Sequence, residues 1–592
     1  MLAAFSRGPA QLGQRAALLV MALGGCVAAA PASVSSPVED MEPRFEGALR
    51  IVDPGPQIVS EEETLDLELR VEGSAARVFM TGMPEGARFD PSQRRLRYTP
   101  DFTQGGKTWT VLVFATDGQQ QTRLSFPLSV RDTIRPPEPQ ILASETVGAW
   151  RRLTVQQRTD TYLDSPGYAG RTFTAIVTTP LVTDGPPRLP LRVGLHGFSG
   201  TPSRNGWEGE LRIFPHDPMN SYWWGYSERL PAGGASTGAV PPYTLRRILH
   251  LVSWALRSFP IADPERVYVE GGSMGGAGAM LLGLTSARHF CWVESSIGQA
   301  IARNHRPSRL TQLTALWGTP QRNLAAAFPG VAAAGVWDAQ DMTSLLLTSA
   351  EAREQFLFLK HGKDDSTIHF GATVMASPLT RRSLYGVLQE QHIGHTAIWD
   401  EGGHGPEDPV LRGRWWGSGW NPVFDDTTFV RRHLAFPAFS RSSTDRNPGT
   451  GNGNGKQPWN PESGYAGKLE VAGDTGWDGE LAGVLNRGLR WDARAIVDTE
   501  NELAMPLKVL DGSGGPPPRP GYPTLGDRLD GKLPVRVDVT PRRVQRFLCL
   551  PGEPLHWRFG AQSGVLRAGE DGSVTVPGLE LSTEWQTLRI WR

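Results

Sequence analysis

Cysteine is almost absent from this chain, which contains 3 in 592 residues. This excludes a scaffold held together by disulfides, because such scaffolds pair several cysteines within each short domain. Cys26 lies near the N-terminus. A disulfide between the other two, Cys291 and Cys549, is not favoured, because they fall in different predicted domains.

An excess of charge of either sign is also missing. The chain has 60 Lys and Arg residues against 61 Asp and Glu residues, which gives a formal net charge of −1. A nucleic-acid-binding surface needs a basic excess, so the composition argues against a nucleic-acid partner. Beyond the N-terminus, no segment approaches the roughly 20 apolar residues of a transmembrane helix. No spaced set of His, Cys and Asp residues demands a metal, and we expect neither a metal nor a cofactor.

Glycine and proline are abundant instead, with 68 and 48 residues. They indicate many turns and loops rather than long helices. Because 592 residues are too many for one hydrophobic core, we expect three or four folding units.

The N-terminus is typical of an export signal. Two arginines precede an apolar run at 16–23, which is too short to cross a bilayer as a mature helix. The following Leu-Gly-Gly-Cys at 23–26 resembles the bacterial lipobox. This resemblance implies cleavage after a signal peptide at 1–25, a lipid on Cys26 and anchoring to a membrane of the bacterial cell envelope. The alternative is an ordinary signal-peptidase site near 28–30 and a secreted protein.

Changes of pattern divide the rest of the chain. Short alternating strands with turn residues between them predict a small β-sandwich early in the chain, and strands without helical periodicity predict a second one at its end. Between them, strands alternate with helices, which predicts a mostly parallel sheet with helices on both faces. The predicted units are a tether at 26–45, a β-sandwich at 46–133, an α/β domain at 134–440, a Gly/Asn-rich linker at 441–465 and a β-sandwich at 466–592.

Hydrophobic periodicity places the main elements of the α/β domain. We expect an amphipathic helix at 244–258, because its apolar residues recur on one face. The predicted strands lie at 173–178, 191–195, 266–270, 356–359 and 397–399.

One short motif carries most of the functional information. A strand at 266–270 leads into Gly271-Gly272-Ser273-Met274-Gly275, and a helix rich in small residues follows. A tight strand–turn–helix elbow of this kind lifts a serine hydroxyl above a sheet, where a base can reach it. The sequence therefore predicts Ser273 as a nucleophile, with the amide of Met274 at the helix N-terminus as one oxyanion donor.

A serine nucleophile needs a base and an acid that orients it. The strand at 356–359 runs into His-Gly-Lys-Asp-Asp, which predicts Asp365 as the acid, with Asp364 as the alternative. The strand at 397–399 runs into a Gly-Gly-His-Gly loop, which predicts His404 as the base. The other nearby histidines, at 369, 392 and 395, lack such a loop, and we expect them to be packing or surface residues.

The second oxyanion donor is expected on the loop after an earlier strand. Residues 191–195 lead into His196-Gly197-Phe198, so we expect the backbone amide of Phe198 to be this donor and His196 to support the loop.

Taken in chain order, the oxyanion loop, the elbow, the acid turn and the histidine loop resemble those of the α/β-hydrolase superfamily. The similarity covers about 165–440 and is greatest to secreted esterases of the polyhydroxybutyrate-depolymerase and feruloyl-esterase type. The segment at 84–101 resembles immunoglobulin-like or cadherin-like domains of bacterial surface proteins, where it would serve as a spacer or contact module. A segment at about 300–350, outside the shared core, is a candidate cap over the site.

The resemblance implies a serine esterase that acts through an acyl-serine intermediate. Aromatic residues at 222–226 and 414–420 suit a carbohydrate-linked or aryl ester, but core packing explains them equally well. Two other functions remain open. One is a peptidase similar to prolyl oligopeptidase, although the repeated four-stranded blades of its propeller are not apparent. The other is a non-catalytic protein that binds a surface.

Overall fold

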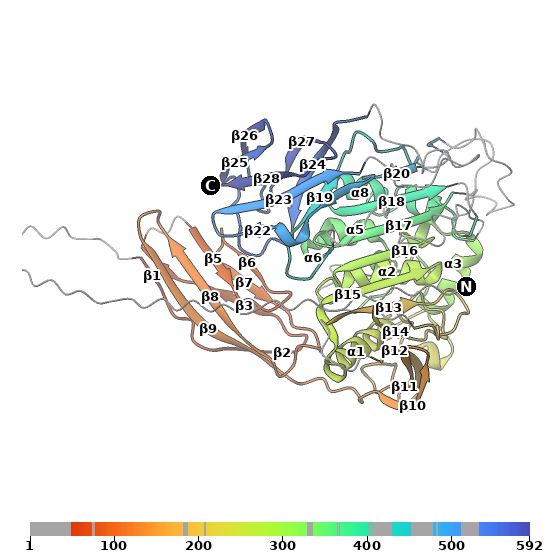
Figure 1. Ribbon diagram of the computed structural model, residues 1–592. Helices are drawn as coiled ribbons and strands as arrows, with labels where there is room; N and C mark the ends of the chain where they lie inside the picture. The colour runs from red at the N-terminus through yellow and green to blue at the C-terminus, as the bar shows by residue number, and fades with distance from the viewer. Residues whose placement is uncertain are drawn as a thin grey trace, which may run out of the picture. The chain divides into compact units, whose positions relative to one another are not determined.

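The computed structural model describes residues 49–73, 77–181, 188–206, 209–327, 335–363, 365, 367–400, 403–404, 429–450, 478–480, 483–510 and 532–592. Residues 47–592 form one compact unit. Its elements follow three successive parts of the chain (Figure 1): a first group of strands, a large sheet accompanied by helices α1–α8, and a last group of strands. The predicted signal peptide, Cys26 and the whole of the predicted tether lie outside the described residues.

The first part consists of short strands around one core. β8 (Thr108–Thr116) shows why they form, because Val111, Val113 and Ala115 are buried while the residues between them are more exposed. These strands make a four-stranded sheet in the order β2-β9-β8-β5, a three-stranded sheet β3-β7-β6 and the pair β1-β4. The other bounds are β1 (Arg50–Ile51), β2 (Gln57–Ser60), β3 (Leu65–Glu68), β4 (Val71–Glu72), β5 (Arg77–Thr81), β6 (Arg88–Asp90), β7 (Arg95–Tyr98) and β9 (Gln121–Arg131). The predicted similarity to immunoglobulin-like domains stays a prediction.

The central sheet has ten strands in the order β10-β11-β12-β14-β13-β15-β16-β17-β18-β20. The five pairings from β14 to β18 are parallel and the pairings at both ends are antiparallel, so the sheet is mixed. This sheet and the helices between its parallel strands form an α/β architecture, as the alternation of strands and helices predicts. The strands are β10 (Gln140–Val147), β11 (Trp150–Arg158), β12 (Thr172–Pro180), β13 (Leu189–Leu195), β14 (Leu211–Phe214), β15 (Ala262–Gly272), β16 (Trp292–Ser296), β17 (Phe356–Gly362), β18 (Gly394–Asp400) and β20 (Gly483–Leu485).

All five strands predicted for this domain are present, and each extends beyond the range predicted for it. The predicted helix is also confirmed as α1 (Tyr243–Ser258), and α2 (Met274–Thr285) follows the elbow. The segment at about 300–350 contains α3, α4 and α5, and α6 begins at its end. The remaining helices are α3 (Pro307–Trp317), α4 (Val336–Ala339), α5 (Met342–Thr348), α6 (Ala350–Arg353), α7 (Gly371–Val374) and α8 (Leu384–Glu390).

The two faces of the sheet are covered differently, which corrects one prediction. Alternate residues such as Val269 and Leu357 share a core with the helices. Their neighbours Tyr268 and Phe358 point to the other face, where they share a second core with C-terminal strands. The prediction of helices on both faces is therefore wrong for the described residues, because C-terminal strands occupy the place where the second helical layer was expected.

The last part of the chain contributes a three-stranded sheet, β19-β24-β27, and a larger sheet built on β21-β23-β28-β25-β26. Its pairings cross the predicted domain boundaries twice, because β19 pairs with β24 and β20 pairs with β18 of the central sheet. The strand that begins at Leu489 ends at Trp491, and a 3₁₀ turn over Ala493–Ala495 follows. The bounds are β19 (Phe436–Ser440), β21 (Leu489–Trp491), β22 (Val497–Asp498), β23 (Glu502–Val509), β24 (Val535–Arg542), β25 (Pro554–Phe559), β26 (Gln562–Arg567), β27 (Val576–Leu581) and β28 (Gln586–Trp591).

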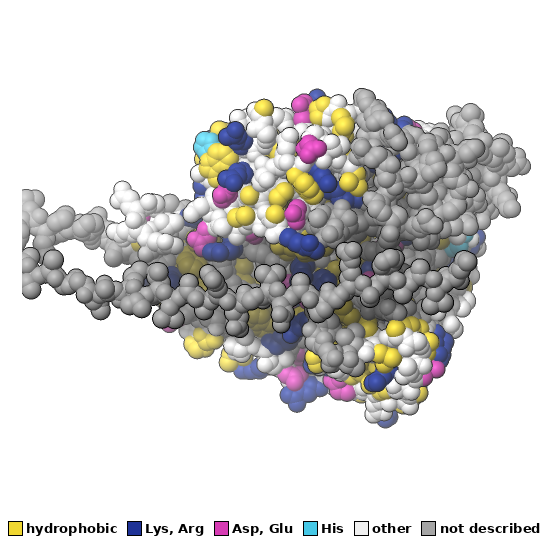
Figure 2. Space-filling model, viewed as in Figure 1, with side chains coloured by type: hydrophobic (Ala, Val, Ile, Leu, Met, Phe, Trp, Pro, Cys, Tyr) yellow, Lys and Arg dark blue, Asp and Glu magenta, His cyan; other side chains and the backbone are white. Residues whose placement is uncertain are grey.

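The described surface carries no single dominant charge in the view of Figure 2. Basic and acidic side chains alternate with apolar ones over the C-terminal sheets. This mixture agrees with the near-zero net charge. Among the described residues, no helix has both the length and the apolar character needed to cross a membrane.

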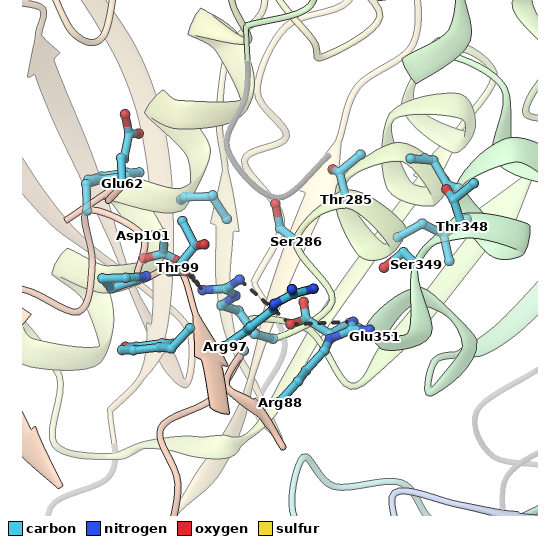
Figure 3. A pocket seen from close by; sticks show the side chains of 18 residues that line it. Glu62, Arg88, Arg97, Thr99, Asp101, Thr285, Ser286, Thr348, Ser349 and Glu351 are labelled. Carbon is cyan, nitrogen blue, oxygen red and sulfur yellow. Dashed lines mark hydrogen bonds and ion pairs between the residues drawn. The ribbon is translucent and has the colours of Figure 1, made fainter. Parts of the chain in front are cut away.

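The first group of strands contacts the central domain through a charged junction. A cavity of about 220 Å³ lies at this junction (Figure 3), and Arg88 and Glu351 approach to 3.8 Å there. Beside it, His289 Nε2 lies 2.6 Å from Asp101 Oδ2, and Arg288 lies 3.8 Å from the same carboxylate. Burial raises the pKa of Asp101, but His289 and Arg288 outweigh burial and hold it well below its usual value.

We predict that Asp101→Asn lowers the free energy of unfolding at pH 7 by about 1–3 kcal/mol. Because the folded-state pKa is lowered, the carboxylate stabilises the fold above its unfolded-state value of about 4. This contribution is lost progressively as the pH falls from the unfolded-state value toward the lowered one, so the difference between the two proteins should shrink steadily below about pH 4. Thermal unfolding from pH 2 to 8 measures it. Asp132→Asn, which changes an exposed ion pair with Arg135, is the matched control and should change little.

Candidate active site

The proposed nucleophile sits on a strained turn between a strand and a helix. β15 ends at Gly272 and α2 begins at Met274, so Ser273 alone joins them. Its backbone angles, φ 59° and ψ −124°, are unfavourable for a residue with a side chain. The Ser273 amide donates to the carbonyl of Ser296 at the end of β16, at 2.9 Å, which fixes the turn to the sheet. The predicted strand–turn–helix elbow is therefore present.

The glycines of the elbow are required by close backbone approach. A Cβ on Gly275 would lie 2.2 Å from the Leu195 carbonyl oxygen, and one on Gly271 would lie 2.3 Å from the backbone of Gly275. A Cβ on Gly272, in contrast, would meet no atom within 4 Å. The first turn of α2 thus packs directly against the end of β13, which holds the oxyanion loop close to Ser273.

The proposed acid follows β17. Asp365 is buried, and its Oδ1 accepts hydrogen bonds from the amides of Thr367 at 2.7 Å and Ile368 at 3.0 Å. These bonds orient the carboxylate toward the neighbouring histidine loop. The alternative acid, Asp364, lies outside the described residues.

The proposed base follows β18 and bridges the other two side chains. His404 Nδ1 lies 2.9 and 2.8 Å from the two carboxylate oxygens of Asp365, and Nε2 lies 2.9 Å from Ser273 Oγ. Because a carboxylate only accepts, Nδ1 carries the proton and Nε2 is free to accept from the serine hydroxyl. The structure therefore brings together three side chains that are predicted from distant parts of the sequence.

The three other histidines near this region have different partners. His369 is buried, its Nε2 lies 2.7 Å from the Asn304 carbonyl, and burial lowers its pKa to about 3. Burial lowers the pKa of His395 to about 4, and its Nδ1 lies 2.7 Å from the Ile393 carbonyl. His392 Nδ1 lies 2.7 Å from Ser440 Oγ. These contacts are those of packing residues, as the sequence predicts.

The proposed oxyanion loop follows β13 and is held by its own hydrogen bonds. The Gly197 carbonyl accepts from His196 Nδ1 at 2.7 Å and from the Gly200 amide at 3.0 Å. Since the two ends of a peptide group point in opposite directions, this fixes the direction of the Phe198 N–H. A Cβ on Gly197 would lie 3.7 Å from Ser273 Cβ, so the loop passes beside the nucleophile. The Met274 amide is in the first turn of α2, where amides lack acceptors within the helix.

Side chains from remote segments support this loop, and sequence reasoning missed them. Asn220 Oδ1 accepts from the Ser199 amide at 2.6 Å. The guanidinium of Arg309, on α3, lies 3.9 Å from the centre of the Phe198 ring, which is a cation–π distance. Neither residue belongs to a motif, and only the folded chain places them here.

The first aromatic cluster belongs to the core. Trp223 and Trp224 are fully buried. Trp223 packs 4.7 Å from the His196 ring, and Trp224 Nε1 donates to the Val240 carbonyl at 2.9 Å. Core packing therefore explains residues 222–226, and the second cluster, at 414–420, lies outside the described residues.

Comparison with protein-family models and with curated proteins found no match. Among solved structures, the S-formylglutathione hydrolase of Agrobacterium tumefaciens is 16% identical over 45% of this chain and 92% of its own, with a TM-score of 0.31. Fluorophosphonate-binding serine hydrolase F of Staphylococcus aureus is 18% identical over 45% and 94%, with a TM-score of 0.30. An acylaminoacyl peptidase of Pyrococcus horikoshii is 15% identical over 52% and 51%, with a TM-score of 0.28. These identities and TM-scores are low, so the chemistry of the site has to follow from its own side chains.

We predict that Gly275→Ala destabilises the protein far more than Gly272→Ala. The new methyl group at 275 would overlap the backbone of β13, and overpacking of this kind costs about 1–3 kcal/mol or more. The new methyl group at 272 enters open space, which makes it the matched control. Urea unfolding measures both changes, and equal losses of stability would contradict the role given to the backbone contact.

Proposed function

We propose that this protein is a serine hydrolase that cleaves carboxylic esters through an acyl-serine intermediate. The observation that carries the proposal is the position of His404 between Ser273 Oγ and the carboxylate of Asp365. A hydroxyl, an imidazole and a buried carboxylate joined in this order activate the hydroxyl as a nucleophile.

In the first half of the proposed reaction, Ser273 Oγ attacks the ester carbonyl carbon while His404 Nε2 takes the hydroxyl proton. The carbonyl oxygen becomes an oxyanion, which accepts from the amides of Phe198 and Met274, and a single such donor contributes roughly 3 kcal/mol. Asp365 stabilises the imidazolium. The tetrahedral intermediate then collapses, His404 returns the proton to the departing alcohol, and the acyl group remains on Ser273.

In the second half, a water molecule gives a proton to His404 and attacks the acyl carbon. A second oxyanion forms between the same two amides. Its collapse releases the carboxylic acid, and the proton returns from His404 to Ser273 Oγ. The enzyme is restored without a metal or cofactor, because every proton passes through the one imidazole.

Two features, the arrangement of the described strands and the three side chains of the site, favour an esterase over the two alternatives. The peptidases considered carry a propeller of repeated four-stranded blades, and the described residues contain one four-stranded sheet in the first part and no such repeat. A purely adhesive protein has no need for a serine, a histidine and an aspartate at hydrogen-bond distance. We propose carbohydrate-linked or aryl esters as the substrate class.

We also propose that the protein is exported and anchored to a membrane of the bacterial cell envelope through a lipid on Cys26. The lipobox-like residues at 23–26 support this, and the Pro- and Ser-rich segment after them suits a tether.

We predict that Ser273→Ala abolishes both labelling by a fluorophosphonate probe and hydrolysis of 4-nitrophenyl acetate. The loss in kcat should be about 10⁶-fold or reach the detection limit, because no other group replaces the nucleophile. Ser253→Ala, on the remote helix α1, is the matched control and should keep full labelling. If the wild-type protein hydrolyses this ester but not a prolyl-peptide 4-nitroanilide, it is an esterase; cleavage of the anilide alone would favour the peptidase.

For the anchor, we predict that Cys26→Ala moves the expressed full-length protein from the membrane fraction to the soluble fraction. The substitution removes the thiol to which the lipid would be attached. Immunoblotting of the separated fractions measures this, with Cys549→Ala as the control for removing a cysteine. Unchanged association of the Cys26 variant with membranes would contradict the proposal.

A further inference from the structure

In the described part of the chain, a buried arginine beside the oxyanion loop has no acidic partner. Arg309, on α3, is 6% exposed, and its guanidinium lies 3.9 Å from the centre of the Phe198 ring. Of its nitrogens, Nη1 donates to Gln312 Oε1 and Nε is enclosed. Nη2 makes no hydrogen bond with any described residue and is not enclosed, so it is open to a ligand.

Among the described residues, the charges that act on Arg309 and on its neighbour Tyr222 are positive. Burial lowers the pKa of Arg309, Tyr222 opposes this shift, and Arg306 adds to it. Burial raises the pKa of Tyr222 to about 12, and the charges that act on it are Arg309 and Arg306. On the same segment, Asp338 is paired with Arg303 at 2.8 Å. A buried cation without a counter-ion costs free energy, and an anionic ligand would remove that cost.

The guanidinium of Arg309 lies close to the reaction centre. It contacts the ring of Phe198, whose own backbone amide is the proposed oxyanion donor, so little more than one side-chain length separates the cation from the ester carbonyl. The contacts continue toward the proposed base, since the His305 ring lies 6.4 Å from that of Tyr222. Burial lowers the pKa of His305, and the charges of Arg309 and His404 are among those that lower it further. An anion held by Arg309 can therefore belong to the same molecule as the ester.

The chemistry of the guanidinium indicates which anion it takes. A guanidinium presents its N–H groups in one plane, and these match the oxygens of a carboxylate. The contact with the Phe198 ring holds the group in place and leaves Nη2 open. A neutral hydroxyl would not balance the buried charge, and a cation would be repelled by it. One carboxylate balances one guanidinium, so the expected ligand is a singly charged acid.

We propose that Arg309 recognises a carboxylate on the substrate, so that the enzyme prefers esters of acidic molecules, such as dicarboxylic acids or uronic acids esterified through a hydroxyl group, to neutral esters. This inference rests on the proposed esterase function and deepens it, because it adds a charge to the substrate class and names the residue that recognises it. Phe198 serves both parts of the substrate: its amide binds the ester oxygen, and its ring places the guanidinium.

Binding to the Ser273→Ala protein tests this preference without any turnover. The first probes are monomethyl adipate, which carries an ester and a carboxylate, and dimethyl adipate, in which a second neutral ester replaces the carboxylate. Titration followed by saturation-transfer NMR should show that the monomethyl ester binds at least about tenfold more tightly, because a guanidinium–carboxylate pair is charge-assisted. Adding Arg309→Gln should remove this difference, since it removes the charge.

A second pair of probes places the carboxylate in the alcohol part of the ester. 4-Acetoxybenzoate and its methyl ester differ by the same single charge. A preference for the acid in either pair supports the proposal and shows which part of the substrate Arg309 holds. Equal affinities within both pairs, or a preference that survives Arg309→Gln, would overturn it. Equal weakening of all four probes by Arg309→Gln would make Arg309 a support of the loop alone and would overturn it too.

Further controls separate the carboxylate site from the fold and from the proposed function. Arg257→Gln removes an exposed guanidinium from α1 and should keep the preference. If Arg309→Gln lowers the thermal midpoint, Arg309→Lys takes its place and should reduce the preference at least about threefold, because an ammonium lacks the planar fork; an unchanged preference would count against Arg309. Hydrolysis of 4-nitrophenyl acetate by the wild-type protein is measured separately. Preference without hydrolysis would overturn the esterase function alone, and hydrolysis without preference would overturn the carboxylate site alone.

Discussion

The site depends on one contact between backbones. The first turn of α2 crosses the end of β13 so closely that no side chain fits at Gly275, and the same turn excludes a side chain at Gly271. This contact forces Ser273 into a backbone conformation with φ 59° and holds the Phe198 loop beside it. The strain at one residue is balanced by packing between the helix, the sheet and the loop, so the hydroxyl is fixed before any substrate arrives.

The sheet carries the other two parts of the site at the ends of parallel strands. β17 and β18 are parallel neighbours, so the turns that follow them emerge at the same edge. Asp365 and His404 therefore meet although they are 39 positions apart, and Ser273 reaches the same edge from β15. Because the helices in the described part of the chain share a core with one face of the sheet, the other face contacts C-terminal strands and carries a row of charges beside the elbow, such as the Lys360–Glu294 pair.

Local patterns predict the parts of the site well. The Gly-Gly-Ser-Met-Gly elbow, the strand before it and the helix after it follow from residue size and periodicity, and all three are present. The Gly-rich loop after a strand also distinguishes His404 from the histidines at 369, 392 and 395, because none of these lies in such a loop. The catalytic role of these residues stays a prediction until activity is measured.

Long-range pairing is where prediction from the sequence fails. Nothing local to 483–485 indicates that this short strand completes the edge of the central sheet beside β18. The same holds for Arg309 under Phe198 and for Glu294 beside Glu270, since each contact joins segments that are distant along the chain. The Trp223–Trp224 pair could not be assigned from the sequence either, because an aromatic pair is equally compatible with a binding cleft and with a core. In the structure both side chains are buried, which assigns them to the core.

The most direct test of the account is a crystal structure of the protein after reaction with a fluorophosphonate. We expect a covalent bond from Ser273 Oγ to phosphorus. One phosphoryl oxygen should then lie about 2.7–3.1 Å from both the Phe198 and Met274 amide nitrogens. An adduct on another serine, or a phosphoryl oxygen that contacts neither amide, would contradict it.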